Sequence, residues 1–220
     1  DGSKTQNTRV SYPLEHIDNS LLSQGKNSIA SHPKNIIFLT CDAYGVLPPV
    51  AKLSPEQAMY HFISGYTAKV AGTERGISEP VATFSPCFGG PFLTLHPLVY
   101  AELLKEKMNK FNVPAFLVNT GWVGSNASTG SPRISLPITR KIIHNILDGT
   151  IQSCSFEKDP FFGFHIPTKL DDIDSNILLP NNIWDNEKEY LVAAKDLIKK
   201  FQDNFSQYDI DDERIKNAGP

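Results

Sequence analysis

A glycine-rich loop between a predicted strand and a predicted helix carries residue types suited to holding a nucleotide. The apolar run at 115–119 predicts the strand, and the loop after it contains Gly121, Gly124 and Gly130. A helix is expected to start near Ser135. Nucleotides are often bound where a strand, a flexible loop and a helix follow in this order. Alone the signal is weak, because neither G-x-G-x-x-G nor G-x-x-x-x-G-K-[ST] occurs in the 220 residues.

Asp42 holds a comparable position after a second apolar run. Residues 35–40 predict a buried central strand, and an acid just past such a strand lies where α/β folds place their sites. Capping of a local turn would explain the same aspartate equally well, so both interpretations stay open. His61 falls on a predicted helix and Cys87 in a loop without a catalytic motif, and we interpret both as structural residues.

Two segments rich in glycine follow a clear helix start. Ser54, Pro55 and Gln57 predict an N-terminus with a capping box. Residues 65–76 contain three glycines, one lysine and one arginine, and predict a polar loop. Long loops in compact domains are often functional lids, and we favour a lid over a simple solvent loop. Residues 83–91 predict a second loop, rich in glycine and proline.

Apolar strands alternate with amphipathic helices along the rest of the chain. The helix after Pro97 carries Lys105, Lys107 and Lys110, which we expect to be solvated. Apolar residues spaced by three and four predict the longest helix over 186–208. This alternation predicts an α/β or α+β fold with a mixed sheet, organised as one unit.

Composition excludes several classes of protein. A net charge of −3 argues against a nucleic-acid binder, which a basic face would indicate. Cys41, Cys87 and Cys154 predict neither a disulfide framework nor a zinc site, and they favour a reduced, cytoplasmic setting. No apolar run reaches the roughly 18 to 20 residues that would span a bilayer. The polar start without a methionine suggests a chain that begins inside a longer protein.

Short segments spread in order along the whole chain form one recognisable pattern. They are Asn-Thr-Arg-Val-Ser-Tyr-Pro at 7–13, Ile-Ile-Phe-Leu-Thr at 36–40, Asp-Ala at 42–43, Gly-Val-Leu-Pro-Pro at 45–49, Tyr-His-Phe at 60–62, Gly-Thr-Glu-Arg-Gly at 72–76, Asn-Thr-Gly-Trp at 119–122, Arg-Ile-Ser at 133–135 and Ala-Gly-Pro at 218–220. Together they resemble the ATP-dependent phosphoenolpyruvate carboxykinases. The chain departs from that family in length near 24–32 and 124–131.

The resemblance implies a carboxy-lyase of gluconeogenesis that converts oxaloacetate and ATP to phosphoenolpyruvate, carbon dioxide and ADP. Arg9 falls on the family arginine that contacts the organic acid and the transferred phosphate, so it is the implied catalytic, substrate-binding and nucleotide-binding residue. A guanidinium suits this role because it meets carboxylate and phosphate oxygens bidentately. Arg133, Ile134 and Thr139 fall on family positions around the adenine nucleotide. Without the resemblance, Ile134 would be interpreted as core packing and Thr139 as an ordinary helix residue.

The resemblance also implies a lid and a missing partner segment. The implied lid lies near 65–80 and contains Gly72, Thr73, Glu74, Arg75 and Gly76. The whole chain would be the C-terminal portion of the nucleotide-binding domain, packed against an N-terminal part. The phosphate loop and the ligands of a Mg or Mn ion would lie outside the chain, which is therefore expected to be inactive alone. The alternative is a stand-alone nucleotide-binding or regulatory module without catalysis.

Overall fold

The computed structural model describes residues 11, 13, 16–18, 31–69, 80–129 and 133–220. Its strands are β1 (Ile36–Thr40), β2 (Val50–Leu53), β3 (Tyr66–Lys69), β4 (Val81–Phe84), β5 (Ala115–Asn119), β6 (Phe156–Lys158) and β7 (His165–Pro167). Its α-helices are α1 (Pro55–Ser64), α2 (Pro97–Phe111), α3 (Leu136–Leu147), α4 (Ser175–Leu178), α5 (Glu187–Phe205) and α6 (Glu213–Lys216). Short 3-10 helices lie at Pro86–Phe88, Gly90–Phe92, Ala127–Thr129, Thr150–Ser153, Pro180–Asn182 and Ser206–Tyr208.

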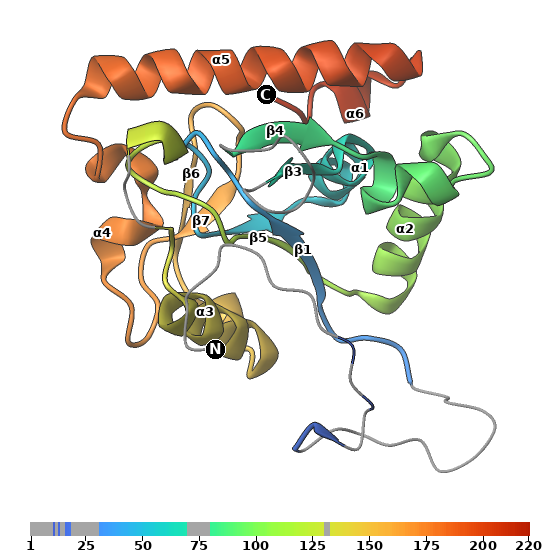
Figure 1. The fold of residues 1–220 in the computed structure, drawn as a ribbon. Coiled ribbons are helices and arrows are strands. Elements are labelled where there is room, and N and C mark those ends of the chain that lie inside the picture. Colours follow the sequence, from blue (N-terminus) through green and yellow to red (C-terminus); the bar gives the residue numbers. More distant parts are fainter. Residues whose placement is uncertain (1–10, 12, 14–15, 19–30, 70–79, 130–132) are drawn as a thin grey trace.

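The larger sheet has five strands in the order β1-β5-β2-β7-β6 (Figure 1). β1 and β5 run parallel, with Thr40 opposite Asn119, so both strands end at the same edge. β2, β7 and β6 continue the sheet with antiparallel pairings. The prediction of a mixed sheet is confirmed. β2 has no counterpart among the predicted strands, because its four residues between a proline pair and a helix cap are too few to show a strand pattern.

Helices lie on both sides of this sheet. In Figure 1, α5 lies on one side of the sheet and α3 on the opposite side. One continuous apolar cluster joins the sheet to both helices, through Ile142 and Ile146 of α3 and Leu197 of α5. α5 confirms the longest predicted helix with shorter bounds. Asn186 is its N-cap, and its predicted last turn is a 3-10 helix.

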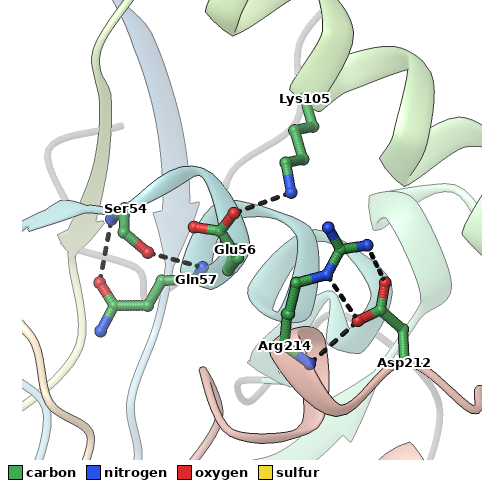
Figure 2. A network of polar contacts seen from close by, with 6 residues as sticks. All are labelled: Ser54, Glu56, Gln57, Lys105, Asp212 and Arg214. Atoms are coloured by element: carbon green, nitrogen blue, oxygen red, sulfur yellow. Dashed lines mark hydrogen bonds and ion pairs between the residues drawn. The ribbon is translucent and has the colours of Figure 1, made fainter.

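The predicted start of α1 is confirmed in detail. The Ser54 hydroxyl accepts from the Gln57 N–H at 3.1 Å, and the Gln57 side chain accepts from the Ser54 N–H at 3.0 Å (Figure 2). Glu56 in the same turn forms an ion pair with Lys105 of α2 at 2.7 Å. The expectation that Lys105 is simply solvated was therefore wrong. α2 packs against α1, which brings the ammonium group to this carboxylate.

The two predicted glycine-rich loops contain a β-hairpin. β3 pairs antiparallel with β4, with Tyr66 opposite Phe84. The loop prediction was thus wrong at 66–69 and at 83–84. Along β3, Tyr66 and Ala68 are buried, whereas Thr67 and Lys69 are only partly buried, which is the period of two that a half-buried strand shows. Flanking glycines obscured this short pattern in the sequence.

An aromatic cluster fills the space between α1, α5 and the loop before β7. It consists of Tyr60, His61, Phe162, Phe164 and Phe201, all buried. The His61 ring lies 4.9 Å from that of Phe164 and 5.4 Å from that of Phe201. Its Nε2 has no hydrogen-bond partner in the described part of the chain, and burial lowers the pKa of the imidazole to about 3. His61 is a buried residue of the core, as expected, but its ring is incompletely hydrogen-bonded.

Candidate nucleotide site

The candidate site lies at the sheet edge where β1 and β5 both end. Two loops leave the sheet there, at 41–49 and 120–129, and backbone hydrogen bonds of 2.8 to 3.1 Å tie them together. The N–H group of Thr120 donates to the carbonyl of Thr40, that of Trp122 to Asp42, that of Gly124 to Gly45, and that of Ala127 to Ala43. In α/β sheets, ligands bind just outside the carboxyl ends of parallel strands. The predicted strand, loop and helix therefore adjoin the loop that contains Asp42, a contact that local spacing did not predict.

Gly121 allows the two loops to approach this closely. A Cβ atom added at Gly121 would lie 2.3 Å from the carbonyl oxygen of Asp42 and 2.4 Å from its nitrogen. No side chain fits at such distances, because the obstructing atoms are backbone. Gly121 is thus required by close packing of two backbones.

Asp42 organises the loop after β1. Its side chain is 0% exposed, and it accepts from the N–H groups of Tyr44, Val46 and Leu47 at 2.7 to 2.9 Å. The hydroxyl of Tyr66 donates to it at 2.8 Å. Burial raises the pKa of this carboxyl, and the hydrogen bonds oppose that rise. The turn-capping interpretation is confirmed, since each carboxylate oxygen already accepts two hydrogen bonds.

Arg133 lies against the loop after β5. Its Nε donates to the carbonyl oxygen of Thr120 at 3.0 Å, and its Cζ lies 5.5 Å from the ring centroid of Trp122. The Cys41 thiol is buried nearby. Burial raises the pKa of Cys41, and the positive charge of Arg133 partly opposes the shift. Arg133 thus lies at the ends of both parallel strands, with its planar group over an aromatic face.

Ile134 and Thr139 accompany Arg133 at the start of α3. Ile134 is 8% exposed, and its N–H donates to the carbonyl of Gly121 at 2.8 Å. Thr139 lies in the first helical turns, where its N–H donates to the carbonyl of the N-cap Ser135 at 3.0 Å. The three residues expected around adenine thus lie on one short stretch that leads into α3. Arg9 and the expected lid residues Gly72–Gly76 lie outside the described residues.

A cavity of about 510 Å³ borders the same two loops. Ala43 and Asn126 line it from the loops, and residues of β4 and α5 line its other walls. Arg133, Ile134 and Thr139 are not among its lining residues. The cavity is therefore a space beside the candidate adenine wall and not the wall itself.

The described residues offer no cluster for a metal ion. Within these ranges, no three His, Cys, Asp or Glu side chains come together in a way that could hold one. No described helix is both long enough and apolar enough to cross a membrane.

The comparison with known families decides the family of the chain. A family model described as phosphoenolpyruvate carboxykinase matches residues 1–176. The chain belongs to this family. The resemblance expected from the short sequence segments is confirmed, and the mixed sheet flanked by helices agrees with a nucleotide-binding domain of the α/β class.

Three bacterial proteins, each named phosphoenolpyruvate carboxykinase (ATP), illustrate the similarity to the family. The protein of Campylobacter lari is 55% identical over 221 residues, which cover 100% of this chain and 41% of that protein. That of Leptospira biflexa is 56% identical over 94% of this chain and 38% of its own length. That of Caldanaerobacter subterraneus is 52% identical over 98% of this chain and 40% of its own length. The chain thus spans about 40% of the length of these carboxykinases.

Three residues around this candidate site belong to the segment 119–122 that carries the resemblance, but none of them was predicted to be a site residue. Asn119 is the last residue of β5, and Thr120 is the first residue of the loop after it. The ring of Trp122 lies beneath the guanidinium of Arg133. Polar residues directly after two buried strands were the available signal. That signal drew attention to Asp42, but the pairing of Asp42 with Asn119 across 77 residues could be seen only in the fold.

Proposed function

We propose that this chain supplies the adenine side of the ATP site in an ATP-dependent phosphoenolpyruvate carboxykinase. In that reaction a carbon–carbon bond of oxaloacetate breaks and carbon dioxide leaves. The enolate oxygen that remains takes the terminal phosphoryl group of ATP, which yields phosphoenolpyruvate and ADP. The observation that carries the proposal is the position of Arg133, held by Thr120 and Trp122 where β1 and β5 end. The names of the relatives support the reaction.

Each residue of the proposed adenine wall would make a different contact. The planar guanidinium of Arg133 can stack on a base or donate hydrogen bonds to its edge. Ile134 offers an apolar surface, and the Thr139 hydroxyl can accept from or donate to the base or ribose. Such contacts place the nucleotide without taking part in bond making, so they act mainly on binding.

The remaining expectations are part of the same proposal. Arg9 would contact the organic acid and the phosphoryl group in transfer, and Gly72–Gly76 would belong to a lid that excludes water. Residues 1–220 would form the C-terminal portion of the nucleotide-binding domain and pack against an N-terminal part. The phosphate loop and a Mg or Mn site would lie in that part, as the family resemblance implies. The chain alone would then be inactive.

A cytoplasmic location completes the proposal. Cys41, Cys87 and Cys154 are all free thiols in the structure, as expected for a reducing compartment.

The test uses the full-length protein that carries this chain. Arg133→Ala should raise KM for ATP about tenfold or more, because a charged hydrogen-bonding group is lost from the base site. KM for oxaloacetate should change little. Arg140→Ala is the matched control, since Arg140 lies on the exposed face of α3 a few residues further along the chain. Steady-state kinetics with each substrate varied in turn gives both constants.

Two results would contradict the proposal. An unchanged KM for ATP in Arg133→Ala would remove Arg133 from the nucleotide site. ATP binding by the full-length protein without oxaloacetate-dependent ATP consumption would favour the alternative of a binding module without catalysis.

A further inference from the structure

Asn119, the last residue of β5, is 0% exposed, and its amide is fully hydrogen-bonded. Its Oδ1 accepts from the N–H of Asp42 at 3.0 Å and from that of Gly121 at 2.8 Å. Its Nδ2 donates to the carbonyl of Leu47 at 3.1 Å and to that of Trp122 at 3.0 Å. A side-chain amide has two donors and two acceptor positions. All four are in use, so Asn119 acts on the protein around it and not on a ligand.

The bond to Gly121 orients a peptide unit that reaches Arg133. The N–H of Gly121 and the carbonyl of Thr120 belong to one planar trans peptide and point in opposite directions. Asn119 holds the N–H end of this plane at 2.8 Å. The carbonyl end accepts from Nε of Arg133 at 3.0 Å. A rotation of this plane would therefore displace the guanidinium.

The next peptide unit forms a second link, to Ile134. The N–H of Trp122 donates to the carbonyl of Asp42 at 2.8 Å, and the Gly121 carbonyl in the same plane accepts from the N–H of Ile134 at 2.8 Å. Asn119 bonds the peptide planes before and after this one, since it accepts from the N–H of Gly121 and donates to the carbonyl of Trp122. One buried amide thus controls two successive peptide planes.

We propose that Asn119 is a positioning residue for ATP binding, which sets the two peptide planes that hold Arg133 and Ile134. The inference rests on the proposed adenine side of the ATP site. Hydrogen bonds from a buried amide are directional, so a small change at Asn119 is transmitted to the wall of the site. The effect should appear in nucleotide binding and base selectivity, with little effect on the organic acid.

The test is Asn119→Asp in the full-length protein. Aspartate keeps the shape and one acceptor oxygen, but it places a second oxygen against the carbonyls of Leu47 and Trp122. We expect KM for ATP to rise about tenfold, as the loss of buried hydrogen bonds implies. The ratio of kcat/KM for ATP to that for GTP should fall, and KM for oxaloacetate should stay within about twofold of wild type. If this variant does not fold, Asn119→Ser, which also loses the bonds to the carbonyls of Leu47 and Trp122, should give the same split.

Asn145→Asp provides the matched control. Asn145 is also buried, at 5% exposed, and its Nδ2 donates within α3 to the carbonyl of Lys141 at 2.8 Å. A merely structural asparagine should lower Tm when substituted and leave both KM values and the ATP-to-GTP ratio unchanged. If Asn119→Asp behaves like this control while Arg133→Ala raises KM for ATP, the positioning role is wrong and the ATP site stands. If Arg133→Ala also leaves KM unchanged, both proposals fail.

Discussion

Two buried regions of this molecule are built in opposite ways. The loop junction, made by Asp42, Asn119, Gly121 and Trp122 at the ends of β1 and β5, is joined by hydrogen bonds of defined direction. The aromatic cluster is joined by ring contacts, and Nε2 of His61 within it has no partner among the described residues. The residues of both regions are buried, but only the junction fixes the angles at which groups meet.

This difference indicates a division of roles. Burial of large rings contributes stability and tolerates small shifts, because dispersion and the hydrophobic effect have little directional preference. Hydrogen bonds lose strength when their angles change, so the junction keeps Arg133 and Ile134 in place. Tyr66 joins the two regions, since its ring lies 5.0 Å from that of Phe201 and its hydroxyl donates to Asp42.

The largest loss of stability is expected from Phe201→Ala. Phe201 is 0% exposed and contacts the rings of Tyr60, His61 and Phe162. Its truncation should lower the free energy of unfolding by about 3–5 kcal/mol, through lost burial and a new cavity. Urea unfolding measures this, and Phe92→Ala, at an 87% exposed position, is the control. If the folded variant showed a changed KM for ATP instead, the division between the two regions would be wrong.

Gly121→Ala should act mainly on binding. The added methyl group would overlap the backbone of Asp42 and push the two loops apart. We expect a loss of about 1–3 kcal/mol in the free energy of unfolding, together with a rise of about tenfold in KM for ATP, because the planes next to Arg133 would move. Gly89→Ala is the control, since its added Cβ would meet no atom closer than 3.9 Å. Loss of stability with an unchanged KM would show that the junction serves only the fold.

The effect that is smallest near neutral pH is a dependence of stability on pH. Burial lowers the pKa of His61 in the folded state to about 3, from the ordinary histidine value of 6.5. Below pH 6.5 the unfolded chain binds a proton at His61 that the folded chain does not bind. The free energy of unfolding should therefore fall by about 1.4 kcal/mol for each pH unit as the pH is lowered from about 6.5 to 3. Above pH 6.5 this contribution vanishes.

His61→Leu isolates this contribution. The variant should show a shallower loss of unfolding free energy between pH 7 and about pH 5, measured by urea titration at each pH. Burial raises the pKa of Asp42 and of Asp159, which works in the opposite direction but is common to both proteins. Equal slopes for variant and wild type would show that His61 takes up its proton in the folded state.

Local chemistry in the sequence predicted local structure well. The Ser54 capping box, the strand that ends before Asp42 and the helix that starts after Ser135 are confirmed, because each depends on neighbours within a few residues. β2 and the hairpin of β3 and β4 were missed, since four-residue strands carry too little pattern and owe their form to pairing.

The candidate site was predictable only in part. Family resemblance predicted Arg133, Ile134 and Thr139 as nucleotide-binding residues, and this stays a prediction; the structure shows them in the stretch that leads into α3. Asn119 could not be recognised as their support, because its role depends on Asp42 and on a loop from another part of the chain. Buried polar residues acquire such roles from tertiary contacts, which residue type and spacing do not encode.

The parallel pairing of β1 with β5 means that this site cannot be carried by a contiguous peptide. Asp42 meets Asn119 across 77 residues, and the hydroxyl of Thr120 reaches the carbonyl of Thr40 across 80. A peptide grafted from 115–139 into another scaffold would bring Arg133, but it would leave behind the strand and loop that hold it. Transplanting the site into another protein would require both strands of the pair.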